Sequence, residues 1–241
     1  MAAALLIDDV TVEFGSFRAI DSLSLAIDFG EVRAVIGPNG AGKTTMLDVA
    51  SGITRAKQGR VVFDDAIDIT RSSESEIARA GVRRKFQKPS IFEGLDVRQH
   101  IAIGAQGGLR RTLSSYALAQ RVDDVLAEIG LADLALRPAS ELAHGQKQWL
   151  EIGMVLASQP KVLMLDEPVA GLTDEETERT VALVRKLRRP DRAIVVVEHD
   201  MDFVEQIADR VTVLHEGRTL FEGSMQDARA DARVVDVYLG R

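Results

Sequence analysis

A glycine-rich segment near the start of the chain constrains the fold more than any other feature of the sequence. Residues 37–44 read Gly-Pro-Asn-Gly-Ala-Gly-Lys-Thr, which satisfies the pattern G-x-x-x-x-G-K-[ST]. The apolar run Val32–Ile36 before it is typical of a buried strand, and the residues from Thr44 onward are typical of a helix. Such a loop binds phosphate oxygens through its main-chain N–H groups and the positive end of the helix. We therefore expect a strand, a phosphate-binding loop and a helix, in that order.

The loop predicts ATP and Mg²⁺ as ligands. The side chain of Lys43 would reach the β- and γ-phosphates, and the hydroxyl of Thr44 would ligate Mg²⁺. The candidate ATP-binding residues of this segment are Gly37, Pro38, Asn39, Gly40, Ala41, Gly42, Lys43, Thr44 and Thr45.

A second apolar strand ends in two carboxylates. Val162–Leu165 is followed by Asp166 and Glu167, and the carboxyl end of a parallel strand lies at the same edge of a sheet as the phosphate loop. We expect Asp166 to hold Mg²⁺, directly or through water. We expect Glu167 to orient or deprotonate the water that attacks the γ-phosphate.

Two further polar residues are candidates for this edge. His199 follows the apolar strand Ala193–Val197 and could donate to the γ-phosphate. Gln87 follows a short strand-like piece that begins at Gly81, and its neutral amide could contact both the metal ion and the attacking water. Both assignments depend on the phosphate loop and the carboxylate pair.

The remaining patterns predict an α/β fold. Val10–Phe14 and Leu23–Ile27 alternate apolar and polar residues, which is typical of a small antiparallel sheet. Leu118–Ile129 has apolar residues at helical spacing, and Thr173 and Glu176 form a capping box that starts another helix. The other predicted strands are Arg60–Phe63, Val211–Leu214 and Arg218–Phe221, the last two joined as a hairpin. Strands that alternate with helices indicate a largely parallel sheet.

Composition excludes several classes of protein. The chain has 241 residues, a formal charge of −7 and no cysteine. Disulfides and Cys-based metal sites are therefore excluded, and an acidic chain is a poor candidate for non-specific binding of nucleic acid. The predicted helix that starts at Thr173 ends in basic residues, which we interpret as a solvated helix end that matches the macrodipole. We expect neither a signal peptide nor a membrane-spanning segment.

The order of motifs resembles the ATP-binding subunit of ABC transporters over nearly the whole chain. Gln87 is similar to the family's Q-loop glutamine, His199 to its switch histidine, and Leu142–Gln146, which reads Leu-Ala-His-Gly-Gln, to its LSGGQ signature. Ala170–Thr173 resembles its D-loop, and Phe14 matches the aromatic residue that stacks on adenine. A core position at the end of a strand is the alternative for Phe14, since aromatic side chains are common in cores.

The resemblance implies a P-loop NTPase (RecA-like) core with an N-terminal antiparallel β subdomain and an inserted α-helical subdomain. Residues 1–86 and 159–223 would form the nucleotide-binding core and its β subdomain. Residues 87–158 would form the helical subdomain that carries the signature, and residues 224–241 a C-terminal tail. All would belong to a single ABC ATPase domain.

In this family, two cassettes close head to tail, so ATP lies between the phosphate loop of one subunit and the signature of the other. The candidate signature residues for this contact are Ala143, His144, Gly145 and Gln146. We expect the N–H groups at Gly145 and in the helix after it to point outward, toward a phosphate brought by the partner. Ala143 replaces the usual serine, His144 replaces a glycine and could supply a donor, and Thr173 stands where Asp is usual.

The resemblance also implies partners and a location. A second ABC ATPase subunit, identical or related, would complete the dimer, and transmembrane permease subunits would contact the region Gln87–Leu95. Ile91 and Phe92 are candidate contacts, with packing inside the helical subdomain as the alternative. A solute-binding protein would act indirectly, and no nucleic acid is expected. The subunit would be peripheral, on the cytoplasmic side of the inner (plasma) membrane.

Three stretches resemble the branch of the family that imports branched-chain amino acids and urea, namely Phe86–Glu93, His144–Glu151 and Glu167–Glu176. The combination of the last two is most similar to urea-importer ATPases, which predicts an ATPase that powers urea import. The alternative solutes are branched-chain amino acids or another small polar molecule, because nothing in an ATPase chain touches the solute.

Three other functions compete with this interpretation. A soluble ABC ATPase of DNA repair or translation would carry long heptad arms or two cassettes. A P-loop kinase for a small molecule would leave the signature and His199 unexplained. An ATP-gated switch that does not hydrolyse ATP conflicts with the presence of Glu167.

Overall fold

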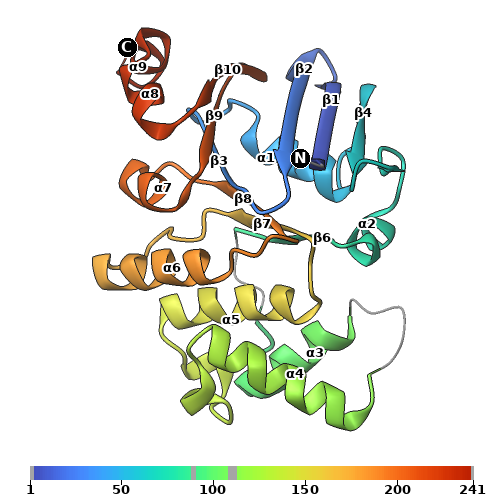
Figure 1. Cartoon of the computed structure of the whole chain (residues 1–241), viewed down its shortest axis with the longest axis vertical. Coiled ribbons are helices and arrows are strands. Elements are labelled where there is room, and N and C mark those ends of the chain that lie inside the picture. Colours follow the sequence, from blue (N-terminus) through green and yellow to red (C-terminus); the bar gives the residue numbers. More distant parts are fainter. Residues whose placement is uncertain (1–2, 88–90, 108–112, 240–241) are drawn as a thin grey trace.

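The computed structural model describes residues 3–87, 91–107 and 113–239. An antiparallel sheet lies at one end of the molecule, a mixed sheet in the middle, and a group of helices at the other end (Figure 1). This arrangement confirms the predicted α/β class and matches the layering expected when strands alternate with helices.

The antiparallel sheet forms from the predicted N-terminal strands, which extend further than their alternating patterns indicated. Its strands are β1 (Ala3–Phe14), β2 (Phe17–Asp28), β4 (Gln58–Phe63) and β5 (Ile67–Asp68), in the spatial order β2-β1-β4-β5. β1 pairs with both β2 and β4 in antiparallel register.

The six-stranded sheet has the order β10-β9-β3-β8-β7-β6. Its strands are β3 (Val32–Ile36), β6 (Val82–Lys85), β7 (Val162–Asp166), β8 (Ala193–Val197), β9 (Arg210–His215) and β10 (Arg218–Gly223). All neighbouring pairs are parallel except the hairpin of β9 and β10, which the sequence predicted.

The described helices lie beside this sheet and in the group at the other end of the molecule (Figure 1). They are α1 (Lys43–Ser51), α2 (Glu74–Ala80), α3 (Val97–Gln106), α4 (Ser115–Glu128), α5 (His144–Ala157), α6 (Asp174–Lys186), α7 (Met201–Ile207), α8 (Met225–Ala230) and α9 (Ala232–Leu239). The capping box at the start of α6 is formed as predicted. α8 and α9 lie in the segment that the sequence predicted only as a tail. No helix in the described residues is both long enough and apolar enough to cross a bilayer.

Alternate residues of the central strands pack against different layers. In β7, Leu163 and Leu165 belong to the core shared with α3, α4 and α5, whereas Met164 belongs to the core shared with the antiparallel sheet. This follows from the two-residue period of a strand that is buried on both faces. Trp149 of α5 donates from Nε1 to Thr180 Oγ1 of α6 at 2.9 Å, which ties the helical layer to the rest of the chain.

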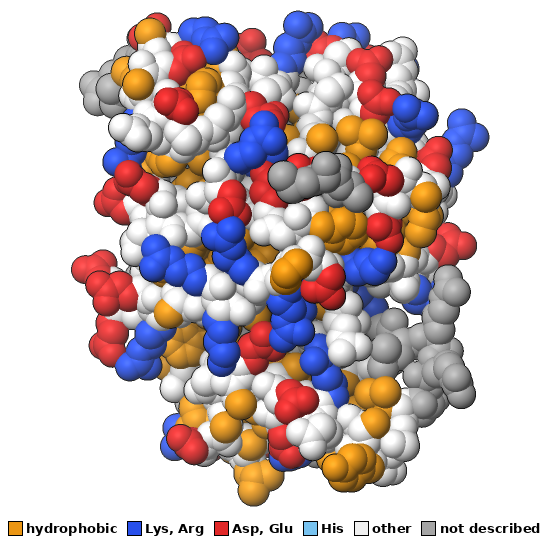
Figure 2. Space-filling model, viewed as in Figure 1, with side chains coloured by type: hydrophobic (Ala, Val, Ile, Leu, Met, Phe, Trp, Pro, Cys, Tyr) orange, Lys and Arg blue, Asp and Glu red, His pale blue; other side chains and the backbone are white. Residues whose placement is uncertain are grey.

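The basic end of α6 is exposed, as the sequence interpretation expected, and it also contacts two neighbouring helices. Arg185 donates to the main-chain oxygen of Gln206 at the end of α7, and Lys186 donates to the main-chain oxygens of Ala127 and Glu128 at the end of α4. These exposed cations therefore also cap two neighbouring helices, because C-terminal carbonyls favour positive charge. On the visible face, acidic side chains lie among the basic ones (Figure 2).

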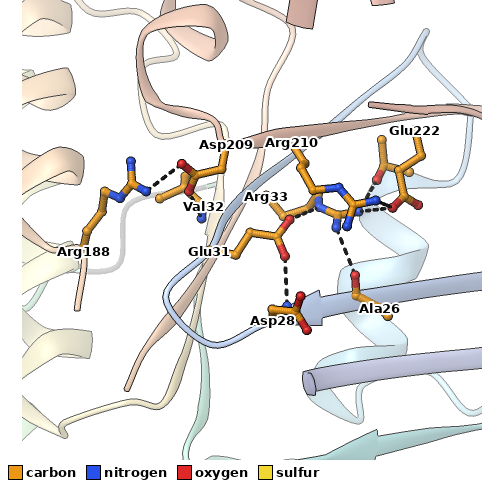
Figure 3. Close-up of polar contacts among 10 residues, drawn as sticks. Ala26, Asp28, Glu31, Val32, Arg33, Arg188, Asp209, Arg210 and Glu222 are labelled. Carbon is orange, nitrogen blue, oxygen red and sulfur yellow. Dashed lines mark hydrogen bonds and ion pairs between the residues drawn. The ribbon is translucent and has the colours of Figure 1, made fainter. Parts of the chain in front are cut away.

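The amino-terminal ends of β3 and β9 hold a buried ion network (Figure 3). The side chain of Arg33 is fully buried, and its Nε lies 2.5 Å from Glu31 Oε1. Its Nη1 contacts Glu222 Oε1 at 3.1 Å and Thr212 Oγ1 at 3.0 Å, and its Nη2 donates to the main-chain oxygen of Ala26 at 3.0 Å. All three guanidinium nitrogens thus have partners, as a buried cation requires.

Candidate nucleotide-binding site

Four neighbouring parallel strands deliver the predicted site residues to one edge of the sheet. In the order β3, β8, β7 and β6, the strands are followed by the phosphate loop, His199, Glu167 and Gln87. The carboxyl ends of parallel strands share one edge, so residues that lie far apart in the sequence become neighbours.

The phosphate loop takes a conformation that glycine makes possible. Gly37 has φ 150°, and a Cβ there would lie 2.2 Å from the main-chain oxygen of Leu214. Gly42, with φ 102°, is the N-cap of α1 and supplies no side-chain cap. The first-turn N–H groups of this helix, which begins at Lys43 and includes the exposed Thr44 and the half-buried Thr45, therefore keep the polarity that binds phosphate.

The remaining loop residues connect the strand to this helix. Pro38, Asn39 and Gly40 form the turn, and the main-chain oxygen of Pro38 accepts from the N–H of Ala41 at 3.2 Å. Ala41 is buried, and its oxygen accepts from the N–H of Gly217 at 3.0 Å. The turn between β9 and β10 thus holds the loop through this hydrogen bond.

Lys43 lies across this loop. Its Nζ donates to the main-chain oxygens of Gly37 at 2.6 Å and Pro38 at 3.0 Å. Burial lowers the pKa of Lys43, and the nearby charges of Glu167 and Asp166 act in the opposite direction. The ammonium is therefore held by carbonyl groups, within electrostatic reach of both carboxylates.

Asp166 is buried and anchored by Arg84, a residue that the sequence analysis missed. Arg84 Nη2 lies 2.6 Å from Asp166 Oδ2, and Arg84 Nη1 lies 2.5 Å from Asp48 Oδ1 of α1. The guanidinium joins the strand that ends in the carboxylates to the helix that starts at the phosphate loop. The sequence shows only a charged residue inside the strand-like piece after Gly81, and its two partners, Asp48 and Asp166, are brought to it by the fold.

Glu167 has a left-handed main chain, with φ 45°, which is uncommon for a residue other than glycine. Its N–H donates to the main-chain oxygen of Val197 at 2.9 Å, which places the turn against β8. Gln87 Nε2 donates to Glu167 Oε2, and His199 Nδ1 lies 3.9 Å from Glu167 Oε1. The structure therefore brings together all three residues predicted to act at the γ-phosphate. Strain at such a turn is typical of functional sites.

Phe14 stands at the end of β1, in the turn that leads into β2, and is 53% exposed. It is therefore not a core residue, which removes the alternative considered for it. β2 passes close to the phosphate loop, because a Cβ at Gly42 would lie 2.8 Å from the main-chain oxygen of Ala19.

The signature residues form the start of α5. The N–H group of Gly145 is not directed outward as predicted. The N–H of Gly145 donates to Glu176 Oε1 at 3.2 Å, and Gly145 is buried. The expectation that this group points outward is wrong, because the capping glutamate of α6 occupies it. Ala143, the N-cap, donates its N–H to Gln146 Oε1 at 3.0 Å, and His144 Nε2 lies 3.2 Å from the main-chain oxygen of Ala170.

The residues at the edge of the sheet suit magnesium bound together with phosphates. Among the residues that the structure describes, no three His, Asp or Glu side chains gather into a metal cluster. The candidate donors are instead the hydroxyl of Thr44, the amide oxygen of Gln87 and the carboxylate of Asp166. Hard oxygen donors in small number are what Mg²⁺ uses when substrate phosphates supply the other ligands.

Comparisons with known proteins agree with this geometry. Residues 20–170 match the family described as ABC transporter. The chain is 34% identical over 249 residues to the high-affinity branched-chain amino acid transport ATP-binding protein BraF of Pseudomonas aeruginosa, covering 98% of this chain and 97% of that protein. It is 36% identical over 250 residues to the corresponding protein LivG of Escherichia coli K12, with the same coverage.

A solved structure supports the fold over the whole chain. The ADP conformation of MJ1267, an ATP-binding cassette of an ABC transporter, is 29% identical to this chain. The TM-score is 0.90, and the alignment covers 100% of both chains.

Proposed function

This chain belongs to the ABC transporter family, and we propose that it is the ATP-hydrolysing subunit of an importer for branched-chain amino acids. The cassette domain of this family hydrolyses ATP, and this chain has that domain. The observation that carries the solute class is the end-to-end match to BraF and LivG, which are named for transport of branched-chain amino acids. The sequence patterns favoured urea as the solute. These relatives instead support the alternative, branched-chain amino acids.

The geometry supplies a role for each residue at the edge of the sheet. The loop of Gly37 to Thr45 would bind the phosphates, with Lys43 at the β- and γ-phosphates. Glu167 would accept a proton from the attacking water, since Gln87 and His199 hold its two oxygens on either side. Asp166, Thr44 and Gln87 would hold Mg²⁺, which neutralises charge on the phosphates.

The partners belong to the same proposal. A second cassette, identical or related, would bring its phosphate loop to the exposed residues Ala143 and His144 at the start of α5. Permease subunits would contact the region Gln87–Leu95, where Phe92 is 52% exposed and Ile91 is partly buried against the helical core. Residues 88–90 of this region lie outside the described residues. The location would be peripheral, on the cytoplasmic side of the inner membrane.

The adenine contact completes the site. The exposed ring of Phe14 would stack on the base, since aromatic faces attract nucleobases. Replacing Phe14 with Ala should weaken ATP binding by roughly 1–3 kcal/mol.

The test uses the complete importer, purified through a tag on this chain and placed in lipid vesicles. ATP hydrolysis is measured with the co-purified solute-binding protein and either leucine or urea. Stimulation by leucine supports the proposal, whereas stimulation by urea alone would overturn the solute class. Absence of hydrolysis with every solute, despite bound ATP, would overturn the ATPase assignment.

A further inference from the structure

Glu198, directly after β8, is a buried carboxylate that the proposed reaction does not use. Its side chain is fully buried, and it lies under the loop that follows Glu167. Oε1 accepts from the N–H of Val169 at 3.0 Å, and Oε2 accepts from the N–H groups of His199 at 2.9 Å and Asp200 at 3.5 Å. One carboxylate therefore joins the two loops that carry the predicted general base and the predicted γ-phosphate donor.

The surroundings of Glu198 are costly for a carboxylate. Burial raises its pKa, and the hydrogen bonds from Val169, His199 and Asp200 lower it. Its hydrogen bonds come from the main-chain N–H groups of Val169, His199 and Asp200, so it holds the backbone of both loops. A charged acceptor binds N–H groups more strongly than a neutral one, which makes it suited to fixing two loops at once.

The contact also extends to the imidazole. His199 Nδ1 lies 3.7 Å from Glu198 Oε2 and 3.9 Å from Glu167 Oε1. The Nδ1 side of the ring thus faces two carboxylates, although the side chain of His199 is 66% exposed. With Nδ1 on the side of the carboxylates, Nε2 is the ring nitrogen left for a ligand.

We infer that Glu198 is a positioning residue for ATP hydrolysis, which sets the loop of Glu167 and the loop of His199 in one fixed relation. This inference rests on the proposed ATPase function. Glu198 does not touch the reacting atoms. It acts by keeping the proton acceptor and the imidazole in register with each other while the phosphate loop, on β3, binds the nucleotide independently.

The decisive variant is Glu198→Gln, which keeps the shape of the side chain but replaces one acceptor oxygen with an NH₂ group. That NH₂ group would face a main-chain N–H, so two donors would meet and a hydrogen bond would be lost. We expect kcat for ATP hydrolysis to fall roughly 10- to 100-fold, as for loss of a hydrogen bond to a charged group. The Kd for a fluorescent ATP analogue should stay within about twofold, because the phosphate loop is untouched.

The matched control is Glu31→Gln at the other end of the sheet. Glu31 is also a buried acid, and its Oε2 accepts from the N–H of Asp28 at 2.9 Å. This variant should lower the melting temperature and leave kcat unchanged. Glu198→Gln with the kcat of the wild type, or with kcat and ATP affinity lost in parallel, would overturn the inference.

A measurement on the wild-type chain covers the case in which Glu198→Gln does not fold. Amide hydrogen exchange should show protection of the N–H groups of Val169 and His199 well above that of exposed loops. Exchange of both at the rate of free loops would overturn the inference. A wild-type chain that binds ATP but never hydrolyses it would overturn the proposed function itself, which separates the two failures.

Discussion

The six-stranded sheet carries buried charge at the amino ends and at the carboxyl ends of its strands. The two groups of charges have different partners. At the amino ends of the strands, Arg33 has partners at all three nitrogens, including Glu31 and Glu222. At the carboxyl ends, Lys43 is held by carbonyl groups and Asp166 is paired with Arg84, and the charges of Asp166 and Glu167 lie within electrostatic reach of Lys43. Removing one partner from a buried ion network destabilises the fold, whereas charges gathered at one edge of a sheet are available to a ligand.

This difference predicts which variants lose activity and which lose stability. Residues at the carboxyl end should affect ATP binding or hydrolysis with little change in the free energy of unfolding. Residues at the amino end should do the reverse. Strain at functional sites commonly costs stability, so some variants at the carboxyl end should even be more stable than the wild type.

The largest effect is expected for Glu167→Gln. Removal of the proposed general base should slow ATP hydrolysis by roughly 10²- to 10⁴-fold, while ATP binding persists because the phosphate loop is unchanged. The measurement is phosphate release at saturating MgATP, together with sedimentation, in which the variant should form an ATP-dependent dimer. Unchanged turnover would remove Glu167 from the catalytic role.

The opposite end of the sheet should give the largest loss of stability. Arg33→Met leaves Glu31 buried without its ion partner, so the free energy of unfolding should fall by about 3–5 kcal/mol. Urea unfolding measures this loss, and folded protein recovered at low temperature should bind ATP with the affinity of the wild type. A stable variant with impaired ATP binding would contradict the division of roles between the two ends.

Lys43→Met should weaken ATP binding roughly 10- to 100-fold, because the side chain loses its charge-assisted contacts with phosphate. Without nucleotide, its stability should equal or exceed that of the wild type, since burial disfavours the ammonium and its partners in the chain are carbonyl groups. Isothermal titration with ATP and urea unfolding of the apo protein give the two values. ATP affinity equal to that of the wild type would refute the assignment of the loop.

A pH experiment sharpens the comparison through Lys85, which lies at the end of β6 with Nζ 3.8 Å from Glu151 Oε2 of α5. Burial lowers the pKa of Lys85, while Glu151, Asp166, Glu198 and Glu167 act in the opposite direction. Between the lowered pKa and about 10.4, the unfolded chain holds a proton that the folded chain has lost. The contribution of Lys85 to stability should therefore increase as the pH rises through this range.

The check compares the wild type with Lys85→Met by urea unfolding at pH 7.5 and pH 9.5. Because the two proteins differ only at residue 85, the change in their stability difference between the two pH values reports on the lysine. The free energy of unfolding of the wild type, relative to that of the variant, should be larger at pH 9.5 than at pH 7.5. An equal gap at both values would show that burial does not shift this group.

Much of this organisation follows from local sequence patterns. The strand before the phosphate loop, the carboxylates after β7 and the position of His199 depend on periodicity and on the rule that parallel strands end at one edge, so they could be predicted. Arg84 and Glu198 could not, because a charged residue in or after a strand acquires its role from the partner that the fold brings to it.

The signature region shows the same limit. The pattern of helix start and glycine predicted exposed N–H groups at Gly145, but the partner of this group, Glu176, comes from a different helix. α8 and α9 were missed for another reason, since short helices at the end of a chain have few residues from which to read a period.

The smallest effect is expected where the signature helix meets α6. The hydroxyl of Thr173 caps α6 and donates to Glu176 Oε2 at 3.2 Å, while Glu176 Oε1 accepts from the N–H of Gly145, so Thr173→Ala removes a cap without removing a charge. The free energy of unfolding should fall by about 1 kcal/mol. Because Glu176 also loses a hydrogen bond that orients it toward Gly145, the exchange rate of the Gly145 N–H should rise as well. Loss of stability with unchanged exchange at Gly145 would show that the cap of α6 does not orient Glu176 toward Gly145. The Glu176–Gly145 contact would then affect only stability, as the ion network around Arg33 is expected to do.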